Sequence, residues 1–177
     1  MKIFLITTIC FAAMLSGQTF QDIQNYASFI GKSPDLMEKF MDKSPLYKES
    51  KFGIENRVYE FTDYSLNIET EVDSNKITEI DMMLLNGEKS SEIWYSISSQ
   101  MYKSRKYDYV EGYYRDLNKL ISENTVTYPD LLQKLRDTND LENIAYQSIF
   151  KDEKQIFYKT FVVSKLLNIT ISNKLND

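Results

Sequence analysis

Two stretches of the chain alternate apolar and polar side chains too regularly for a helix. In residues 64–72, YSLNIETEV, every second side chain is apolar or a threonine, and serine, asparagine or glutamate stands between them. Residues 166–172, LLNITIS, alternate Leu167, Ile169 and Ile171 with polar residues in the same way. Successive side chains of a strand point to opposite faces, so both stretches predict half-buried antiparallel strands whose other face is polar.

The remaining apolar spacing predicts a mixture of helices and strands. Ser33 before Pro34, and Thr127 with Asp130, are typical helix starts. Helices are expected over residues 20–30, 34–42, 90–101 and 128–137. Further strands are expected over 57–61, 77–85, 144–150 and 156–163. Residues 103–116 are ambiguous, because Tyr107 and Tyr109 could alternate as a strand. A helix running to about Ser122 fits the tyrosine spacing better.

A nonapeptide occurs twice in similar form. PDLMEKFMD at 34–42 and PDLLQKLRD at 129–137 share five of nine residues. We therefore expect an α+β fold of two tandem αβββ units, each a helix followed by a three-stranded antiparallel meander. The units cover 19–86 and 107–177, with an extra linking helix at 87–106, and could form one compact domain. A chance match between two amphipathic helices is the alternative.

The order of elements is loosely similar to that of β-lactamase-inhibitor-like and PepSY-like exported modules. The resemblance covers the chain from residue 19 on and concerns element order alone. No signature motif of either family is present, so it implies an exported α+β module and assigns no role to any residue.

Residues 1–18, MKIFLITTICFAAMLSGQ, have the pattern of a cleaved signal peptide. Lys2 precedes an apolar run from Ile3 to Leu15, and the small residues Ser16 and Gly17 follow. The run is short for a bilayer span, which takes about 20 residues, although a retained anchor is the alternative. Cleavage between Ser16 and Gln18 would remove Cys10, the only cysteine. Export without disulfides favours a bacterial periplasmic or secreted protein.

Charge and residue types exclude several function classes. Without residues 1–18 the chain keeps 20 basic and 26 acidic side chains, which is unfavourable for binding nucleic acid. No residue after 18 belongs to an apolar stretch long enough to span a membrane. The chain contains no histidine, which excludes Ser-His-Asp and Cys-His hydrolysis and histidine zinc sites. It also lacks the glycine-rich phosphate-binding motifs. We expect no cofactor and no metal.

Carboxylates, tyrosines and lysines remain as candidate catalytic groups. Glu69 and Glu71 share one face of a predicted strand and could form a glycosidase pair, but a solvated sheet face is the favoured explanation. The strings 73–75 and 137–142 fail the calcium-loop pattern, because Ile77 or Leu141 stands at a ligand position. Turn and helix-end chemistry explains both strings.

The tyrosine-rich segment is the candidate binding surface. Tyr is amphipathic, so an exposed cluster could contact a protein or a sugar. Packing between helix and sheet is the alternative. The candidate residues are Tyr102, Tyr107, Tyr109, Tyr113 and Tyr114.

The leading hypothesis is an exported, non-catalytic interaction protein of the cell envelope or extracellular space. It would bind another protein or an envelope glycan through a sheet face or the tyrosine-rich segment. Two alternatives stay open: a carboxylate-dependent hydrolase acting on glycans, and a carrier of a small apolar ligand.

Overall fold

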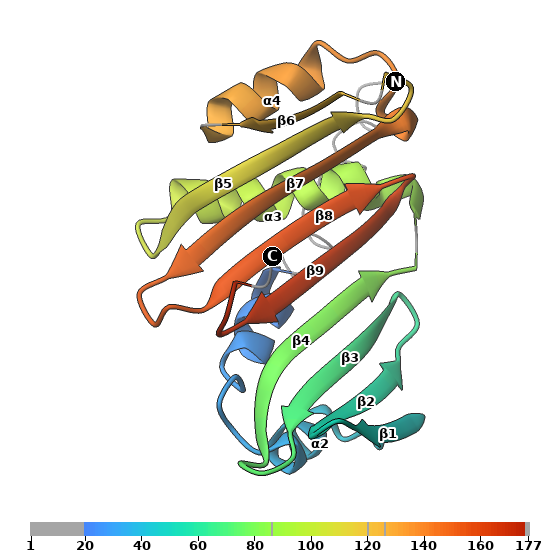
Figure 1. The fold of residues 1–177 in the computed structure, drawn as a ribbon, viewed down its shortest axis with the longest axis vertical. Coiled ribbons are helices and arrows are strands. Elements are labelled where there is room, and N and C mark those ends of the chain that lie inside the picture. The colour runs from blue at the N-terminus through green and yellow to red at the C-terminus, as the bar shows by residue number, and fades with distance from the viewer. Residues whose placement is uncertain (1–19, 86, 120, 126, 176–177) are drawn as a thin grey trace, which may run out of the picture.

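A single antiparallel sheet runs through the whole molecule (Figure 1). The computed structural model describes residues 20–85, 87–119, 121–125 and 127–175, with the backbone alone for 121–125. The nine strands lie in the order β1-β2-β3-β4-β9-β8-β7-β5-β6, and every neighbouring pair is antiparallel. Their bounds are β1 Tyr47–Lys51, β2 Ile54–Glu60, β3 Tyr64–Glu71, β4 Lys76–Leu84, β5 Tyr107–Asp116, β6 Ile121–Thr125, β7 Ile144–Asp152, β8 Phe157–Val163 and β9 Leu166–Ser172.

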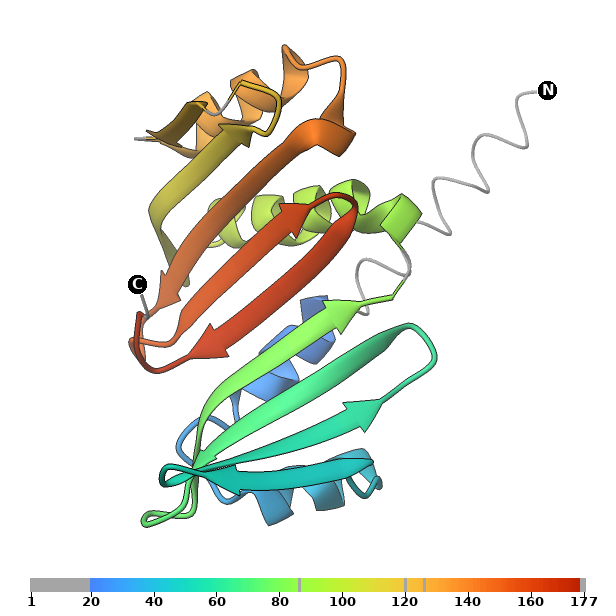
Figure 2. The ribbon, with the colours of Figure 1, turned by 45° about the vertical axis from the view of Figure 1, so that its right-hand side comes forward.

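The helices lie on one side of the sheet (Figure 2). They are residues 20–27, α2 Pro34–Met41, α3 Ser90–Lys103 and α4 Tyr128–Arg136, with short 3-10 turns at Gly87–Lys89 and Leu141–Asn143. α3 packs behind β5, β7, β8 and β9, and α4 packs on β5 and β6. Among the described residues no helix is long and apolar enough to cross a membrane.

The core lies between this helical layer and the sheet. Ile23 from the first helix, Met37 from α2 and Ile97 from α3 are fully buried against the sheet. Leu167, Ile169 and Ile171 of β9 meet them and are also fully buried, which confirms the predicted alternation. The apolar face of each strand thus pairs with the apolar stripe of a helix, and that burial is the main source of stability.

The helix starts follow the local sequence signals. Ser33 caps α2 by accepting a hydrogen bond from the backbone N–H of Asp35 at 3.4 Å. Thr127 caps α4 by accepting one from Asp130 at 3.2 Å, and its hydroxyl donates to the Asp130 carboxylate at 2.6 Å. Gly31 follows the first helix at φ +78°, a conformation that favours glycine. Both predicted caps are confirmed.

The prediction of two tandem αβββ units is wrong. β4 pairs with β9, so the strands of both halves form one continuous sheet, and no repeat units are present in the described chain. A separate meander would leave the backbone groups on the outer edge of β4 unpaired, and pairing with β9 satisfies them. The repeated nonapeptide is accounted for by local helix chemistry, because both copies are short helices with proline in the first turn. The division of the chain into segments at residues 86 and 106 stays a prediction.

The helix favoured between residues 109 and 122 is also wrong. Residues 107–116 form β5, and residues 121–125 form the edge strand β6. The register of β5 against β7 shifts between Tyr109 and Glu111, which identifies a β-bulge at Val110. The extra residue interrupts the two-residue alternation, so the tyrosine spacing resembles a helical period.

Candidate functional site

The sheet has one face without a helix. In Figure 1 this face is turned to the viewer and the helices lie behind it. Within the described residues, no helix covers it, and its strand side chains are mostly half-buried, as expected for a large solvated sheet face. We call this surface, formed by the strand residues that point away from the helices, the open face.

One row of side chains crosses the open face through Tyr113. Each member is the direct cross-strand partner of the next. Phe161 therefore lies one strand away from Gln147, which is the partner of Tyr113. The row combines two aromatic rings with amide and hydroxyl groups, a mixture that suits contact surfaces. From β5 to β2 it runs through Tyr113, Gln147, Phe161, Asn168, Met83, Ser65 and Glu60.

The neighbouring row contains a cross-strand hydrogen bond and a buried apolar side chain. Thr170 of β9 donates its hydroxyl proton to the Asp81 carboxylate of β4 at 2.6 Å, across the junction of the two halves. Ile149 of β7 is only 2% exposed although it points away from the helices. Its cross-strand partner is Lys159, whose aliphatic stem can cover apolar surface.

Charge is unevenly distributed over the open face. Acidic side chains prevail on β2, β3 and β4, with Lys76 at one end, and they are Glu60, Glu69, Glu71, Glu79 and Asp81. Glu69 and Glu79 are direct cross-strand partners, an arrangement that like charges disfavour in an isolated sheet. Arg115, Lys151 and Lys159 stand on β5, β7 and β8, beside Asp108 and Glu111. A partner with complementary charge would thus be oriented along the sheet.

The structure divides the five candidate tyrosines between two faces. Tyr107, Tyr109 and Tyr114 of β5 are half-buried against the core on the helical side. Tyr113 alone stands on the open face, paired with Gln147. Tyr102 lies in the last turn of α3 and is 46% exposed, and its ring centroid lies 4.6 Å from that of Tyr128. The five do not form one surface, and a binding role for each stays a prediction.

An aromatic cluster holds Tyr109, one of the three tyrosines on the helical side. The Tyr128 ring, almost fully buried, lies within 6 Å of the rings of Tyr109 and Phe150 in edge-on geometry. Its hydroxyl forms a 2.8 Å hydrogen bond with Ser98 of α3. Burial raises the pKa of Tyr128 to about 12, so the phenol stays protonated at neutral pH. Such pairs contribute packing energy between α3, α4 and β5.

The carboxylates singled out in the sequence carry local hydrogen bonds. Glu71 accepts one from Ser74 at 2.7 Å, and Asp137 accepts one from Gln133 at 3.0 Å. Glu69 accepts one from the Thr78 hydroxyl at 3.3 Å. In the described part of the chain no group of three or more His, Cys, Asp or Glu side chains is placed to hold a metal ion.

Sequence reasoning did not single out Phe161, Lys159 or Asp81. The strand FYKTFVV carries apolar residues on both faces, so its alternation does not reveal which face is outward. The burial of β8 in the folded sheet reveals the outward face. Tyr158, Thr160 and Val162 are buried, while Phe157, Lys159 and Phe161 are half-buried. The β4–β9 pairing that makes these residues neighbours is a long-range contact without a local signal.

Comparison with protein-family models, curated proteins and solved structures gives no match to this chain.

Proposed function

We propose that this protein is an exported, non-catalytic interaction protein that contacts another macromolecule through its open face. The observation that carries the proposal is the sheet face without a helix over it in the described residues, crossed by a row of aromatic and amide side chains. Aromatic residues are enriched in protein interfaces, and tyrosine is frequent among the few residues that supply most of the binding energy.

Export is supported by the sequence pattern of residues 1–18, which lie outside the described residues. The proposed location is the periplasm or the extracellular space of a bacterium. The partner is a protein or an envelope glycan. Nucleic acid is disfavoured by the acidic composition, and the acidic strands β2 to β4 would repel a phosphate backbone as well.

A photo-crosslinking residue tests the proposal. p-Benzoylphenylalanine at Phe161 places the probe on the open face, and the same residue at Tyr95 places it on α3, where the native side chain is 48% exposed. We expect the Phe161 position to give a discrete adduct in intact cells and the Tyr95 position to give none. Equal adducts from both positions, or none from Phe161, would contradict the assignment of the surface.

Cell fractionation with N-terminal sequencing tests export separately. The expected result is envelope or medium material whose first residue is Gly17, Gln18 or Thr19. Material in the cytosol that retains Met1 and Lys2 would contradict export. The crosslinking result at Phe161 tests the contact surface and does not depend on this outcome.

A further inference from the structure

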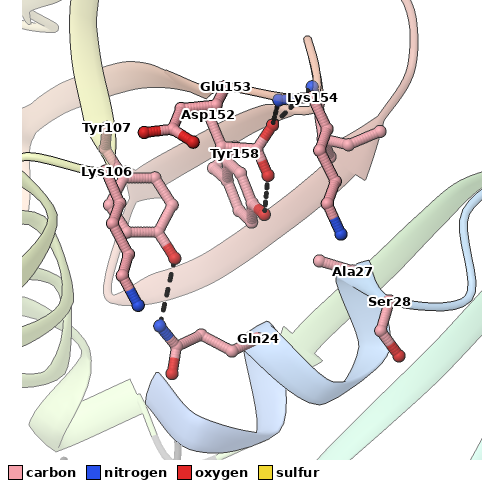
Figure 3. Close-up of a pocket in the computed structure, with 10 residues that line it drawn as sticks. Gln24, Ala27, Ser28, Lys106, Tyr107, Asp152, Glu153, Lys154 and Tyr158 are labelled. Atoms are coloured by element: carbon pink, nitrogen blue, oxygen red, sulfur yellow. Dashed lines mark hydrogen bonds between the residues drawn. The ribbon is translucent and has the colours of Figure 1, made fainter.

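A pocket of about 340 Å³ lies on the helical side of the sheet, apart from the open face (Figure 3). Its walls come from three places that are distant in the sequence: the end of the first helix, the start of β5, and the turn between β7 and β8. This volume is at the lower end of the range of roughly 300–1,000 Å³ for small-molecule pockets.

Two hydrogen bonds fix the polar groups inside the pocket. Gln24 donates from its Nε2 to the Tyr107 hydroxyl at 3.1 Å, which links the first helix to β5. Tyr158 donates its hydroxyl proton to the Asp152 carboxylate at 2.9 Å. The Tyr107 and Tyr158 rings lie edge-on with centroids 5.3 Å apart, so each restrains the other. Preorganised groups of this kind bind ligand with less ordering cost.

The Asp152 carboxylate is occupied by the protein itself. Besides Tyr158 it accepts hydrogen bonds from the backbone N–H groups of Lys154 and Ile156, at 2.9 and 3.0 Å. Burial, and next the nearby Asp152 carboxylate, raises the pKa of Tyr158. The phenol therefore stays protonated and acts as the donor of this hydrogen bond. Asp152 therefore shapes the turn and has little capacity left for a ligand.

Two lysines have no such partner. Lys106 and Lys154 extend from opposite walls toward the first helix, as Figure 3 shows. In the described residues neither ammonium group forms an ion pair. Glu153 is the third charged side chain at the pocket that is not bound to its neighbours. Counted with the Asp152 carboxylate, the charged side chains at the pocket sum to zero. The positive charge is local to the two ammonium groups that extend toward the first helix, and a single carboxylate would pair there.

Unused hydrogen-bonding groups and an apolar wall complete the pocket. Gln24 donates a hydrogen bond from its Nε2 to Tyr107, and no group of the described chain donates to its Oε1. Ser28 adds a hydroxyl, while Ala27 and Ile156 supply apolar surface between these groups. We infer that this pocket binds a small hydroxylated carboxylate of the uronic-acid type. Its carboxylate would pair with Lys106 and Lys154, its hydroxyls would bond to Gln24 and Ser28, and its ring would lie on the apolar wall.

Titration of the exported form with D-galacturonate and D-galactose, followed by NMR, tests this inference. The two sugars differ in the carboxylate. We expect saturable shifts with galacturonate at a Kd of about 1 mM, and binding of galactose at least about tenfold weaker because it cannot form the charge-assisted bonds. Raising the salt concentration should weaken galacturonate binding, since exposed charges are screened.

Matched variants locate the site. Lys106→Gln with Lys154→Gln should remove the preference for galacturonate, whereas Lys39→Gln with Lys89→Gln, two exposed lysines away from both the pocket and the open face, should keep it. All four lysines are exposed, so both double variants are expected to fold, which circular dichroism checks. Three results would overturn the inference: no saturable shift with either sugar, equal affinity for both, or an equal loss in the two double variants.

Discussion

Arg57 shows how a single side chain attaches α2 to the sheet. Among the described residues it is the only charged side chain that is buried, and it points from β2 toward the helix. Its Nη1 donates to Asp35 at 3.1 Å and to Glu38 at 2.8 Å. Burial alone would lower the pKa of Arg57, but hydrogen bonds to the carboxylates, Glu55 foremost, raise it, so the charge is retained.

The pKa of Glu38 provides a pH-dependent test of this network. Partial burial alone would raise it, but hydrogen bonds from Tyr59 and Arg57 hold the pKa of Glu38 below its usual value. A carboxyl group with a lowered folded-state pKa stabilises the protein above its unfolded pKa, and this stabilisation is lost as the pH falls through the folded pKa.

Urea unfolding of the wild type and Glu38→Gln at a series of pH values measures this contribution. We expect the wild type to be more stable by a constant amount at neutral pH. The difference should shrink below about pH 4.5, where the unfolded chain begins to bind the proton. Glu60→Gln is the control, because Glu60 is exposed on the open face. A difference that grows on acidification would contradict the lowered pKa of Glu38.

At the scale of elements, local chemistry decides where the helices begin. The two caps are not equivalent, because Thr127 both accepts from Asp130 and donates to its carboxylate, whereas the Ser33 bond to Asp35 is long at 3.4 Å. We expect Thr127→Ala to lower the free energy of unfolding by about 1 kcal/mol and Ser33→Ala to lower it by about half as much. Chemical denaturation measures both, and a larger loss at Ser33 would contradict the geometry.

The elements that the sequence predicts correctly are those with a strong periodic signal. The helix at α3 follows from the spacing of Trp94, Ile97 and Met101, and β9 follows from its alternation. β1, with the sequence YKESK, is wholly exposed and has no apolar alternation, so it escapes detection. Exposed charged residues are what protect an edge strand from pairing with other chains, and they also hide it in a sequence.

The candidate site depends on contacts that no local pattern encodes. Tyr113 and Tyr114 are adjacent in sequence and point to opposite faces, and the bulge at Val110 decides which of them joins the open face. The pocket near Gln24 joins residues that are 83 positions apart. Sequence composition thus indicates that the chain is rich in aromatic residues. The strand register determines which of these rings lie on the open face and which pack in the core.

At the scale of the whole molecule, the β4–β9 pairing joins both halves into one sheet. Six cross-strand pairs connect the two strands. Two of these pairs, Ile80 with Ile171 and Met82 with Ile169, are almost fully buried. Because this junction lies in the middle of the sheet, it places the acidic strands β2 to β4 in the same surface as the aromatic row of β5, β7 and β8. Without it there would be no continuous open face.

An engineered disulfide across this junction tests the account most directly, in the full chain with Cys10→Ser. Met83→Cys with Asn168→Cys joins direct cross-strand partners, and Met83→Cys with Gln147→Cys joins positions three strands apart in the same row, roughly 14 Å at a strand spacing of ~4.8 Å. Disulfides require Cα atoms within about 7 Å. On oxidation we predict, by mass spectrometry, an intramolecular bond in the first variant and free thiols in the second. Free thiols in the first variant, or equal bonding in both, would contradict the single sheet.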